Sequence, residues 1–406
     1  MAYRGPIDLT FVQRVIDAEL PETQELEYKR QQPKKITNPT RADQSRPDPL
    51  EEFAKDVSAM ANASGGVLLY GVAEDPESKK TTLYAIGDET YDQAQVRLHS
   101  LLDSLIEPRL MGVQFFEVPV DGGYVMGIVV PGSFAGPHWH GKSEKRRFSV
   151  RRGARVSEFT HQELRAAFDR NASATAQARQ WIADRVAVIK NEQTWRQMTF
   201  GPKVIVHLVP LVSYTQQTDF VDPNQARHMA DQLPCPWKHG YTHDINFDGL
   251  VIYPRDGTYR NFLDLVAYTQ VFRDGSIEVV MFTRPENNPN PDARDIRPPN
   301  IARTVHDSIL KAPSVLQRLG KLGPMMIGVS LIETAGYELP DPANSDHRAH
   351  RSDRNDLTVP PLFVEDPQRV EELERTTKTA LTMLWQGFGF AECPYYDDAG
   401  NYHDQA

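Results

Sequence analysis

A Gly-Gly turn that leads into an apolar segment is the feature that most constrains the fold of this chain. Residues 59–64 have the composition of a helix end, Gly65 and Gly66 stop that helix, and residues 67–72 form a nearly continuous apolar run. Such a run, bounded by glycine, is typical of a buried strand. The sequence therefore predicts a helix, a tight turn and a buried strand, after which the chain becomes acidic.

A second acidic segment comes earlier in the chain. Residues 22–29 read Glu-Thr-Gln-Glu-Leu-Glu-Tyr-Lys, and the alternation of apolar and charged side chains is that of a half-buried strand. Two acidic strand ends and a lysine are what a metal-dependent phosphodiester-cleaving site requires, because carboxylates hold divalent ions and lysine neutralises charge at the phosphate. The candidate catalytic residues are Glu22, Glu27, Lys29, Glu74 and Asp75. The four carboxylates in this set are the candidate ligands for Mg²⁺ or Mn²⁺.

The spacing of these acids leaves alternatives open. Glu22 and Glu27 point to opposite faces of one extended strand, so a shared ion requires Glu22 to fold back from a turn before the strand. Glu74 is the better third ligand if the second strand bulges, and Asp75 is the better one if it does not. The alternative to a metal site is that these acids are surface charges whose only role is in the geometry of a binding surface. Lys29 either stabilises the phosphate or pairs with Glu25 on the strand surface.

A basic segment stands out in a chain whose net charge is −10. Residues 142–155 contain seven basic side chains and one acidic side chain. Phe148 and Val150 alternate with basic residues, so the basic side chains are predicted to project from one side of a strand and to bind a nucleic-acid backbone. A loop is predicted to present Trp139, together with His138 and His140, beside the basic strand, where the tryptophan is placed to stack on an unpaired base. The candidate nucleic-acid-binding residues are Trp139, Lys142, Lys145, Arg146, Arg147, Arg151, Arg152 and Arg155.

The acidic strand and the Gly-Gly segment together resemble the Schlafen AlbA-type domain. The matching patterns are E-[TS]-x-x-[LV]-E-[FY]-K and A-x-A-N-x-x-G-G-x-L-x-x-G-V-x-[DE]-D, and the resemblance extends over residues 15–170. It implies a nucleic-acid-binding domain that in some members is a metal-dependent RNA endonuclease for tRNA-like substrates. It also implies metal ligands at Glu22, Glu27 and an acid after the Gly-Val strand. Ala73 directly follows Gly71-Val72, so this chain departs from the pattern there.

The chain length of 406 residues accommodates two or three domains. We expect an α+β protein with a Schlafen AlbA-type domain at residues 1–170, a helical connector at 171–200 and a C-terminal α/β domain of unknown role at 201–406. A capping box at Thr160 predicts a helix that ends near Arg170, before the connector helix.

Two cysteines and the lack of a long apolar run favour a cytoplasmic protein without a membrane span or secretion signal. Two short motifs are interpreted as chance. Residues 136–143 match a phosphate-loop pattern, but the segment that follows has strand character rather than helix character. Cys235, His239 and His243 have a zinc-like spacing without an evident fourth ligand.

Three functions remain open at this stage. The first is a nucleic-acid-binding protein whose N-terminal domain cleaves structured RNA such as tRNA with Mg²⁺ or Mn²⁺. The second is a non-catalytic DNA-binding regulator that uses the same basic strand. The third is a sensor or scaffold protein driven by the C-terminal domain. By analogy with domains that embrace a duplex, we also expect a homodimer.

Overall fold

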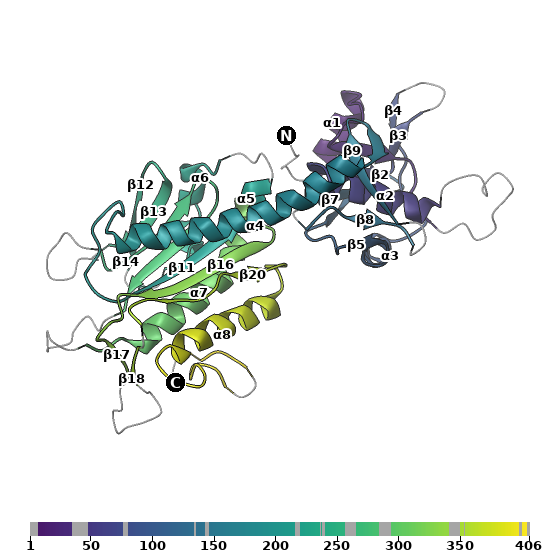
Figure 1. Cartoon of the computed structure of the whole chain (residues 1–406). Helices are drawn as coiled ribbons and strands as arrows, with labels where there is room; N and C mark the ends of the chain where they lie inside the picture. Colours follow the sequence, from purple (N-terminus) through teal and green to yellow (C-terminus); the bar gives the residue numbers. More distant parts are fainter. Residues whose placement is uncertain are drawn as a thin grey trace. The chain divides into compact units, whose positions relative to one another are not determined.

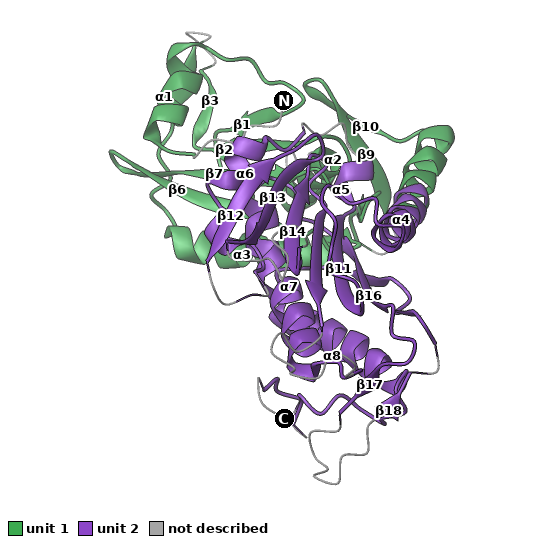
Figure 2. Ribbon diagram, turned by 90° about the vertical axis from the view of Figure 1, so that its left-hand side faces the viewer, with its two compact units in different colours: residues 1–172 green, residues 173–406 purple. Residues whose placement is uncertain are grey.

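The chain forms two compact units, residues 1–172 and residues 173–406, in the computed structural model (Figures 1 and 2). The residues that the structure describes are 7–34, 48–75, 80–133, 135–142, 146–215, 220–235, 237, 240–255, 265–283, 294–340, 350–352, 354–397 and 400–403. Both units mix helices and strands, so the expected α+β class is confirmed. None of the described helices has the length and apolar character needed to span a bilayer.

The first sheet of unit 1 has the strand order β1-β2-β7-β6. The bounds of its strands are Leu26–Lys29 for β1, Gly65–Tyr70 for β2, Gln114–Val120 for β6 and Gly123–Pro131 for β7. Strand β1 runs parallel to β2, and the other two pairings are antiparallel. Every residue of β2 is buried, which confirms the predicted buried strand. Gly65 and Gly66 are its first two residues rather than a turn, and the turn after α2 lies at residues 62–64. The acidic segment thus becomes an edge strand that lies directly against the buried one.

Gly66 explains why the Gly-Gly pair constrains the fold. A Cβ atom at this position would lie 2.8 Å from the backbone oxygen of Glu25. Side chains do not tolerate such an approach to backbone, so glycine is required for β1 to begin its pairing here. The backbone amide of Val67 donates a hydrogen bond to that same oxygen at 2.8 Å. Gly66 therefore fixes the position of the acidic strand on β2.

Helices cover both faces of this sheet. Their bounds are Leu9–Asp17 for α1, Pro49–Ala61 for α2 and Tyr91–Leu105 for α3. Helix α1 packs against Val67 and Leu69, whereas α2 and α3 pack against Leu68 and Tyr70 on the opposite face. The Asp48 side chain accepts a hydrogen bond from the Leu50 amide and caps α2.

A second, antiparallel sheet of unit 1 has the order β10-β9-β8-β5. Its strands are β5 (Ile106–Glu107), β8 (Trp139–His140), β9 (Arg147–Arg152) and β10 (Arg155–Glu158). Asn62, at the end of α2, donates hydrogen bonds to the carbonyl oxygens of His138 and Ser149, each at 2.8 Å. These bonds tie the second sheet to the helix that packs on the first. A separate hairpin consists of β3 (Val72–Glu74) and β4 (Thr81–Leu83).

Helix α4 (His161–Lys190) is continuous through the position where two helices were predicted. The capping box at its start is confirmed, because the Thr160 amide donates to Glu163 at 2.8 Å and the Glu163 amide donates to the Thr160 hydroxyl at 3.3 Å. The predicted end near Arg170 is wrong. The sequence around that residue contains neither proline nor glycine, so nothing interrupts the helical hydrogen bonds.

Unit 2 is built on an antiparallel sheet of the order β12-β13-β14-β15-β11-β16-β19, with β20 also paired to β16. The bounds are β11 Lys203–Pro210, β12 Tyr241–Ile245, β13 Gly249–Pro254, β14 Ala267–Phe272, β15 Ile277–Phe282, β16 Met325–Ile332, β19 Leu357–Thr358 and β20 Leu362–Val364. Smaller elements are α5 (Val212–Thr215), α6 (Pro223–Arg227), the 3-10 helix η2 (Ala230–Gln232), β17 (Glu338–Leu339) and β18 (His350–Arg351).

The two faces of this sheet are covered by different helices (Figure 1). Helices α7 (Pro298–Arg318) and α8 (Val370–Gln386) share the larger core with the sheet. The C-terminal part of α4 packs on the opposite face, where Val186 and Ile189 contact a cluster that includes Ile205. Both faces are therefore buried, which explains why every residue of β11 and β16 is buried.

A charged cluster is enclosed on the α4 side of this sheet. Glu278 is fully buried and accepts hydrogen bonds from Arg185 at 2.8 Å, from Tyr268 at 2.8 Å and from His207 at 2.9 Å. Burial raises the pKa of Glu278, but the bonds from Arg185 and His207 outweigh it and hold the pKa at about 2. These four residues, the Glu278 cluster, fasten α4 to the sheet.

Candidate functional site

Glu27 is the buried acid at the centre of the candidate site in unit 1. It lies on β1, is 8% exposed, and forms ion pairs with Arg151 and with Lys29, the latter at 3.0 Å. Arg151 reaches across from β9 and also donates a hydrogen bond to the carbonyl oxygen of Thr23 at 2.8 Å. One arginine thus joins the second sheet to the strand that carries Glu27.

The prediction that Arg151 belongs to an exposed basic surface is wrong. Its side chain is 2% exposed. Side chains alternate along β9, and Arg151 shares the inward direction with the buried Ser149, whereas Phe148 points the other way and contacts Phe168 of α4. The side chains of β9 do alternate between two faces, but Arg151 lies on the face that points into the protein.

Asp56 is a member of the site that sequence analysis missed. It lies on α2 with 3% exposure, and its Oδ2 atom is 3.0 Å from the Lys29 ammonium. Burial raises the pKa of Asp56, and Lys29 offsets this only in part. A signal was present in the sequence, because Asp56 falls between Phe53 and Met60 on the apolar side of the helix. A carboxylate on that side has to find a partner inside the protein.

Lys29 lies between two acids. Its ammonium is 3.0 Å from Glu27 and 3.0 Å from Asp56. Burial lowers the pKa of Lys29, but the charges of Asp56 and Glu27 outweigh it, so the pKa is raised and the side chain stays protonated. Pairing with Glu25, the alternative considered above, is not the contact that the structure shows for its ammonium.

Glu22 folds back toward the strand from the segment before it. Its Oε1 atom accepts a hydrogen bond from the backbone amide of Tyr28 at 3.2 Å. Burial raises the pKa of Glu22, and the negative charge of Glu27 raises it further. Glu22 and Glu27 therefore act on each other electrostatically, as a shared site requires. We name the five residues Glu22, Glu27, Lys29, Asp56 and Arg151 the Glu27 cluster.

Glu74 and Asp75 lie outside the sheet that carries Glu27. Gly71, with a φ of +95°, bends the chain between β2 and β3, and Glu74 then enters the separate β3–β4 hairpin opposite Thr81. The carboxylate of Asp75 accepts a hydrogen bond from the hydroxyl of Tyr84 at 3.1 Å. Glu74 therefore lies on this hairpin, not on the sheet edge that carries Glu27.

A resident Mg²⁺ or Mn²⁺ does not fit the site in this arrangement. Both carboxylate oxygens of Glu27 face cations, one from Lys29 and one from Arg151, and a divalent ion would meet repulsion from both. In the part of the chain that the structure describes, no three His, Cys, Asp or Glu side chains are grouped to hold a metal ion. The predicted ligand set of Glu22, Glu27, Glu74 and Asp75 is therefore not gathered into one metal site there.

The exposed basic residues lie on and beside β9 and β10. Arg146 stacks over the ring of Trp139 at 4.0 Å, and this tryptophan is half-buried. Arg147 pairs with Glu158 at 2.9 Å and Arg152 with Glu163 at 2.6 Å, both pairs being exposed. We name the following residues the β9–β10 surface: Trp139, Arg146, Arg147, Arg152 and Arg155.

Two further lysines were predicted to belong to this surface. Lys142 is exposed and lies 3.5 Å from Asp48 and 3.7 Å from Glu51 at the start of α2. Lys145 lies outside the described residues. Exposed pairs of this kind contribute under about 1 kcal/mol each, so their cations can exchange partners at low cost.

The two histidines beside Trp139 are buried rather than presented to solvent. The ring of His138 contacts the Ser133 hydroxyl and the Pro108 carbonyl oxygen, both at 2.6 Å, and His140 contacts the Ser149 hydroxyl at 2.8 Å. Burial lowers the pKa of both histidines to about 4, so they are neutral at pH 7. Their role as exposed partners of Trp139 is a wrong prediction.

The structure also bears on the two motifs interpreted as chance. Trp139 and His140, inside the phosphate-loop pattern, form β8 and pair with β9, so no helix follows and the pattern is not a phosphate loop. Burial raises the pKa of the Cys235 thiol to about 12, which disfavours the thiolate that zinc requires. His239 of the zinc-like spacing lies outside the described residues.

Comparisons with known proteins address the N-terminal part of the chain. The family model described as "Schlafen, AlbA_2" matches residues 22–160. No curated protein matches the sequence. The N-terminal domain of a RecG-related protein from Nitrosomonas europaea is 18% identical, with a TM-score of 0.25, and the match covers 37% of this chain and 90% of that one.

A second solved structure is the DIP2311 protein from Corynebacterium diphtheriae. It is 16% identical, with a TM-score of 0.27, and the match covers 43% of this chain but only 33% of that protein. The family model includes β1, the Gly-Gly pair and the β9–β10 surface within its bounds. The resemblance of the N-terminal part of this chain to the Schlafen AlbA-type domain is thereby confirmed.

Proposed function

We propose that unit 1 binds nucleic acid through the β9–β10 surface. The observation that carries this proposal is the stacking of the exposed Arg146 on the half-buried Trp139, with further exposed arginines on β9 and β10, in a chain whose net charge is −10. Within the described residues, Arg146 and Arg155 have no carboxylate partner. Phosphate binding by these two arginines would release counterions. It would not first require an ion pair within the protein to break.

Trp139 adds a contact that phosphate binding alone does not provide. Its ring already carries the guanidinium of Arg146 at 4.0 Å. A base that stacks on such a ring gains about 1–3 kcal/mol with little dependence on its identity. The surface therefore suits a nucleic acid that is recognised by its backbone and by exposed bases, and the match to the Schlafen AlbA_2 model supports this assignment.

The test is a binding titration with labelled tRNA and with duplex DNA at several salt concentrations. We expect the double variant Arg152→Glu/Arg155→Glu to bind more weakly and to lose roughly two units of the salt slope. Arg109→Glu is the matched control, because Arg109 is an exposed arginine that pairs with Asp103 elsewhere in unit 1. Unchanged affinity and salt slope in the double variant would contradict the proposal and favour a sensor or scaffold role for the C-terminal unit.

A second candidate function is the cleavage of structured RNA such as tRNA with added Mg²⁺ or Mn²⁺. The convergence of three carboxyl groups, Glu22, Glu27 and Asp56, near Lys29 favours it. Because the two cations already at Glu27 oppose a divalent ion, we derive no cleavage step through a metal. Incubation with and without Mn²⁺ decides the matter. Product formation that Glu27→Gln abolishes, with binding retained, would support a nuclease, whereas binding without product would support a non-catalytic DNA-binding regulator.

A further inference from the structure

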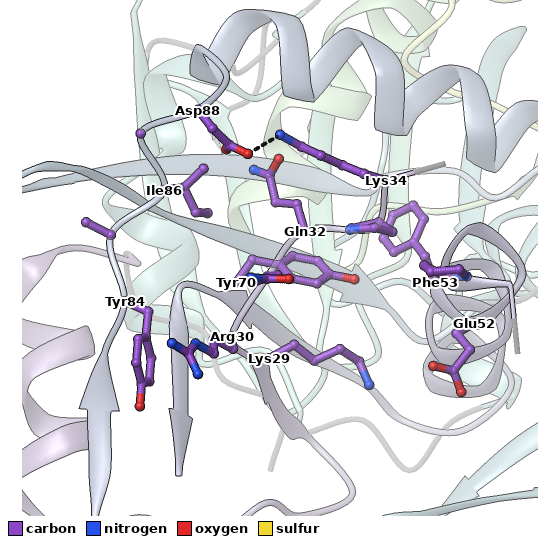
Figure 3. A pocket seen from close by; sticks show the side chains of 15 residues that line it. Lys29, Arg30, Gln32, Lys34, Glu52, Phe53, Tyr70, Tyr84, Ile86 and Asp88 are labelled. Carbon is purple, nitrogen blue, oxygen red and sulfur yellow. Dashed lines mark hydrogen bonds and ion pairs between the residues drawn. The ribbon is translucent and has the colours of Figure 1, made fainter. Parts of the chain in front are cut away.

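A pocket of about 850 Å³ opens in unit 1 beside the Glu27 cluster (Figure 3). Its lining comes from residues 29–34 after β1, the start of α2, the end of β2 and residues 84–88 after β4. Figure 3 shows Arg30 and Tyr84 at one end, Glu52 at the other and Tyr70 between them. The volume lies within the range of roughly 300–1,000 Å³ that is usual for sites of small ligands.

The cations of the lining come from one short segment. Lys29 belongs to the Glu27 cluster, and Lys34 pairs with Asp88 at 2.6 Å. Arg30 is exposed, and within the described part of the chain its guanidinium contacts a ring and has no carboxylate partner. An anionic group that enters the pocket would therefore find Arg30 available, with the ammonium of Lys29 on the neighbouring residue.

The pocket also presents aromatic surface in a fixed position. The guanidinium of Arg30 lies 4.2 Å from the ring of Tyr84, and the Tyr84 hydroxyl is held by Asp75 at 3.1 Å. Phe53 and Tyr70 lie in the wall of the pocket, with their ring centroids 6.3 Å apart and each 1% exposed, so Tyr84 is the ring that a ligand can reach. A planar heterocycle can pack on the Tyr84 ring, while a phosphate on the same ligand meets the arginine.

The wall of the pocket is held by a hydrogen-bond network behind it. Arg97 donates to the carbonyl oxygen of Pro33 at 2.6 Å, to Gln32 at 3.2 Å and to Glu89 at 2.7 Å. Gln32 in turn donates to the hydroxyl of Tyr124 at 3.2 Å. The segment that supplies the cations is therefore positioned before any ligand arrives, which lowers the entropic cost of binding.

We propose that this pocket binds one unpaired nucleotide of the nucleic-acid strand that unit 1 holds, with its phosphate at Arg30 and its base against the ring of Tyr84. The inference rests on the proposed function and goes further by naming the feature recognised. A base inside a duplex is stacked on both faces and paired along its edge, so it cannot enter a pocket of this kind. An overhang, a bulge or a loop nucleotide can.

The experiment uses a duplex with one 2-aminopurine overhang and a blunt duplex of the same sequence with the 2-aminopurine paired. Affinity is measured by fluorescence anisotropy, and stacking by the quenching of 2-aminopurine. We expect the full chain to quench only the overhang. We expect Arg30→Gln and Tyr84→Leu each to weaken overhang binding by roughly tenfold while leaving blunt-duplex affinity within about twofold. Arg109→Gln is the control outside the pocket.

The outcomes separate this inference from the function on which it rests. Equal affinity for both duplexes without quenching would overturn the pocket assignment and leave nucleic-acid binding intact. A lack of binding to either duplex would overturn both. Competition by free nucleoside monophosphate at the concentration of the overhang duplex would also overturn it, because the pocket would then serve a free nucleotide. Arg30→Gln keeps the test valid if Tyr84→Leu lowers the melting temperature, since Arg30 is exposed and its replacement does not threaten folding.

Discussion

Each unit buries a glutamate among side chains that donate hydrogen bonds to it. The two clusters differ in how far these partners offset the cost of burying negative charge. In unit 2, Glu278 is fully buried, all its contacts are donors, and its pKa is about 2. In unit 1, burial leaves the pKa values of Glu22 and Asp56 raised despite the nearby cations. A cluster whose partners fully offset the burial of its carboxylate stabilises the fold. A cluster whose carboxylates keep raised pKa values remains responsive to protons, cations and ligands. The burial of a carboxylate alone therefore does not indicate a functional site, because the groups that offset its charge also matter.

The largest effect is expected from Glu278→Ala. The substitution leaves Arg185 and His207 without their shared acceptor inside the protein, and breaking a buried pair in this way costs about 3–5 kcal/mol. Urea unfolding followed by tryptophan fluorescence measures the loss. Arg351→Gln is the control, because its ion pair with Glu338 is mostly exposed and is worth under about 1 kcal/mol. A loss as small as that of the control would mean that the Glu278 cluster does not fasten α4.

A smaller loss is expected from Glu27→Gln. The amide can still accept one hydrogen bond from Arg151 or Lys29, and Lys29 keeps its contact with Asp56, so about 2–3 kcal/mol is the expected cost. The same unfolding experiment on the same protein compares it with Glu278→Ala. If Glu27→Gln proved the more damaging substitution, the contrast between the two clusters would be reversed.

The smallest effect concerns pH, and its sign differs between the clusters. Asp56 has a raised pKa, so its contribution to stability is complete below the ordinary value of 3.8 and is lost as pH rises through the folded-state pKa. Glu278 has a lowered pKa, so its contribution is complete above 4.5 and is lost as pH falls toward about 2. Wild type should therefore lose stability relative to Asp56→Asn as the pH is raised from 4 to 7. A constant difference between the two proteins would refute this assignment.

Much of the fold of unit 1 could be predicted because local rules and burial agree there. The Asp48 cap and the apolar run of β2 both point to the same structure. The continuity of α4 was missed because the capping box at Thr160 marks where a helix starts and carries no information about its end.

The candidate site was harder to predict, since period-two alternation gives two faces without saying which one is buried. Arg151 lies on the inner face of β9, where a long charged side chain is unexpected and where only the partner Glu27 makes burial tolerable. Asp56 is joined to the site through Lys29, a contact between a helix and a strand that no sequence spacing encodes. Glu74 and Asp75 diverge because Gly71 turns the chain.

The close approach at Gly66 has a consequence for how this site can vary. One added methyl group at this position would collide with the backbone oxygen of Glu25 and push β1 and β2 apart. Everything that β1 carries would then shift away from the arginine that meets it from the other sheet. The geometry of five charged side chains thus depends on a hydrogen atom at a position where every other amino acid has a carbon.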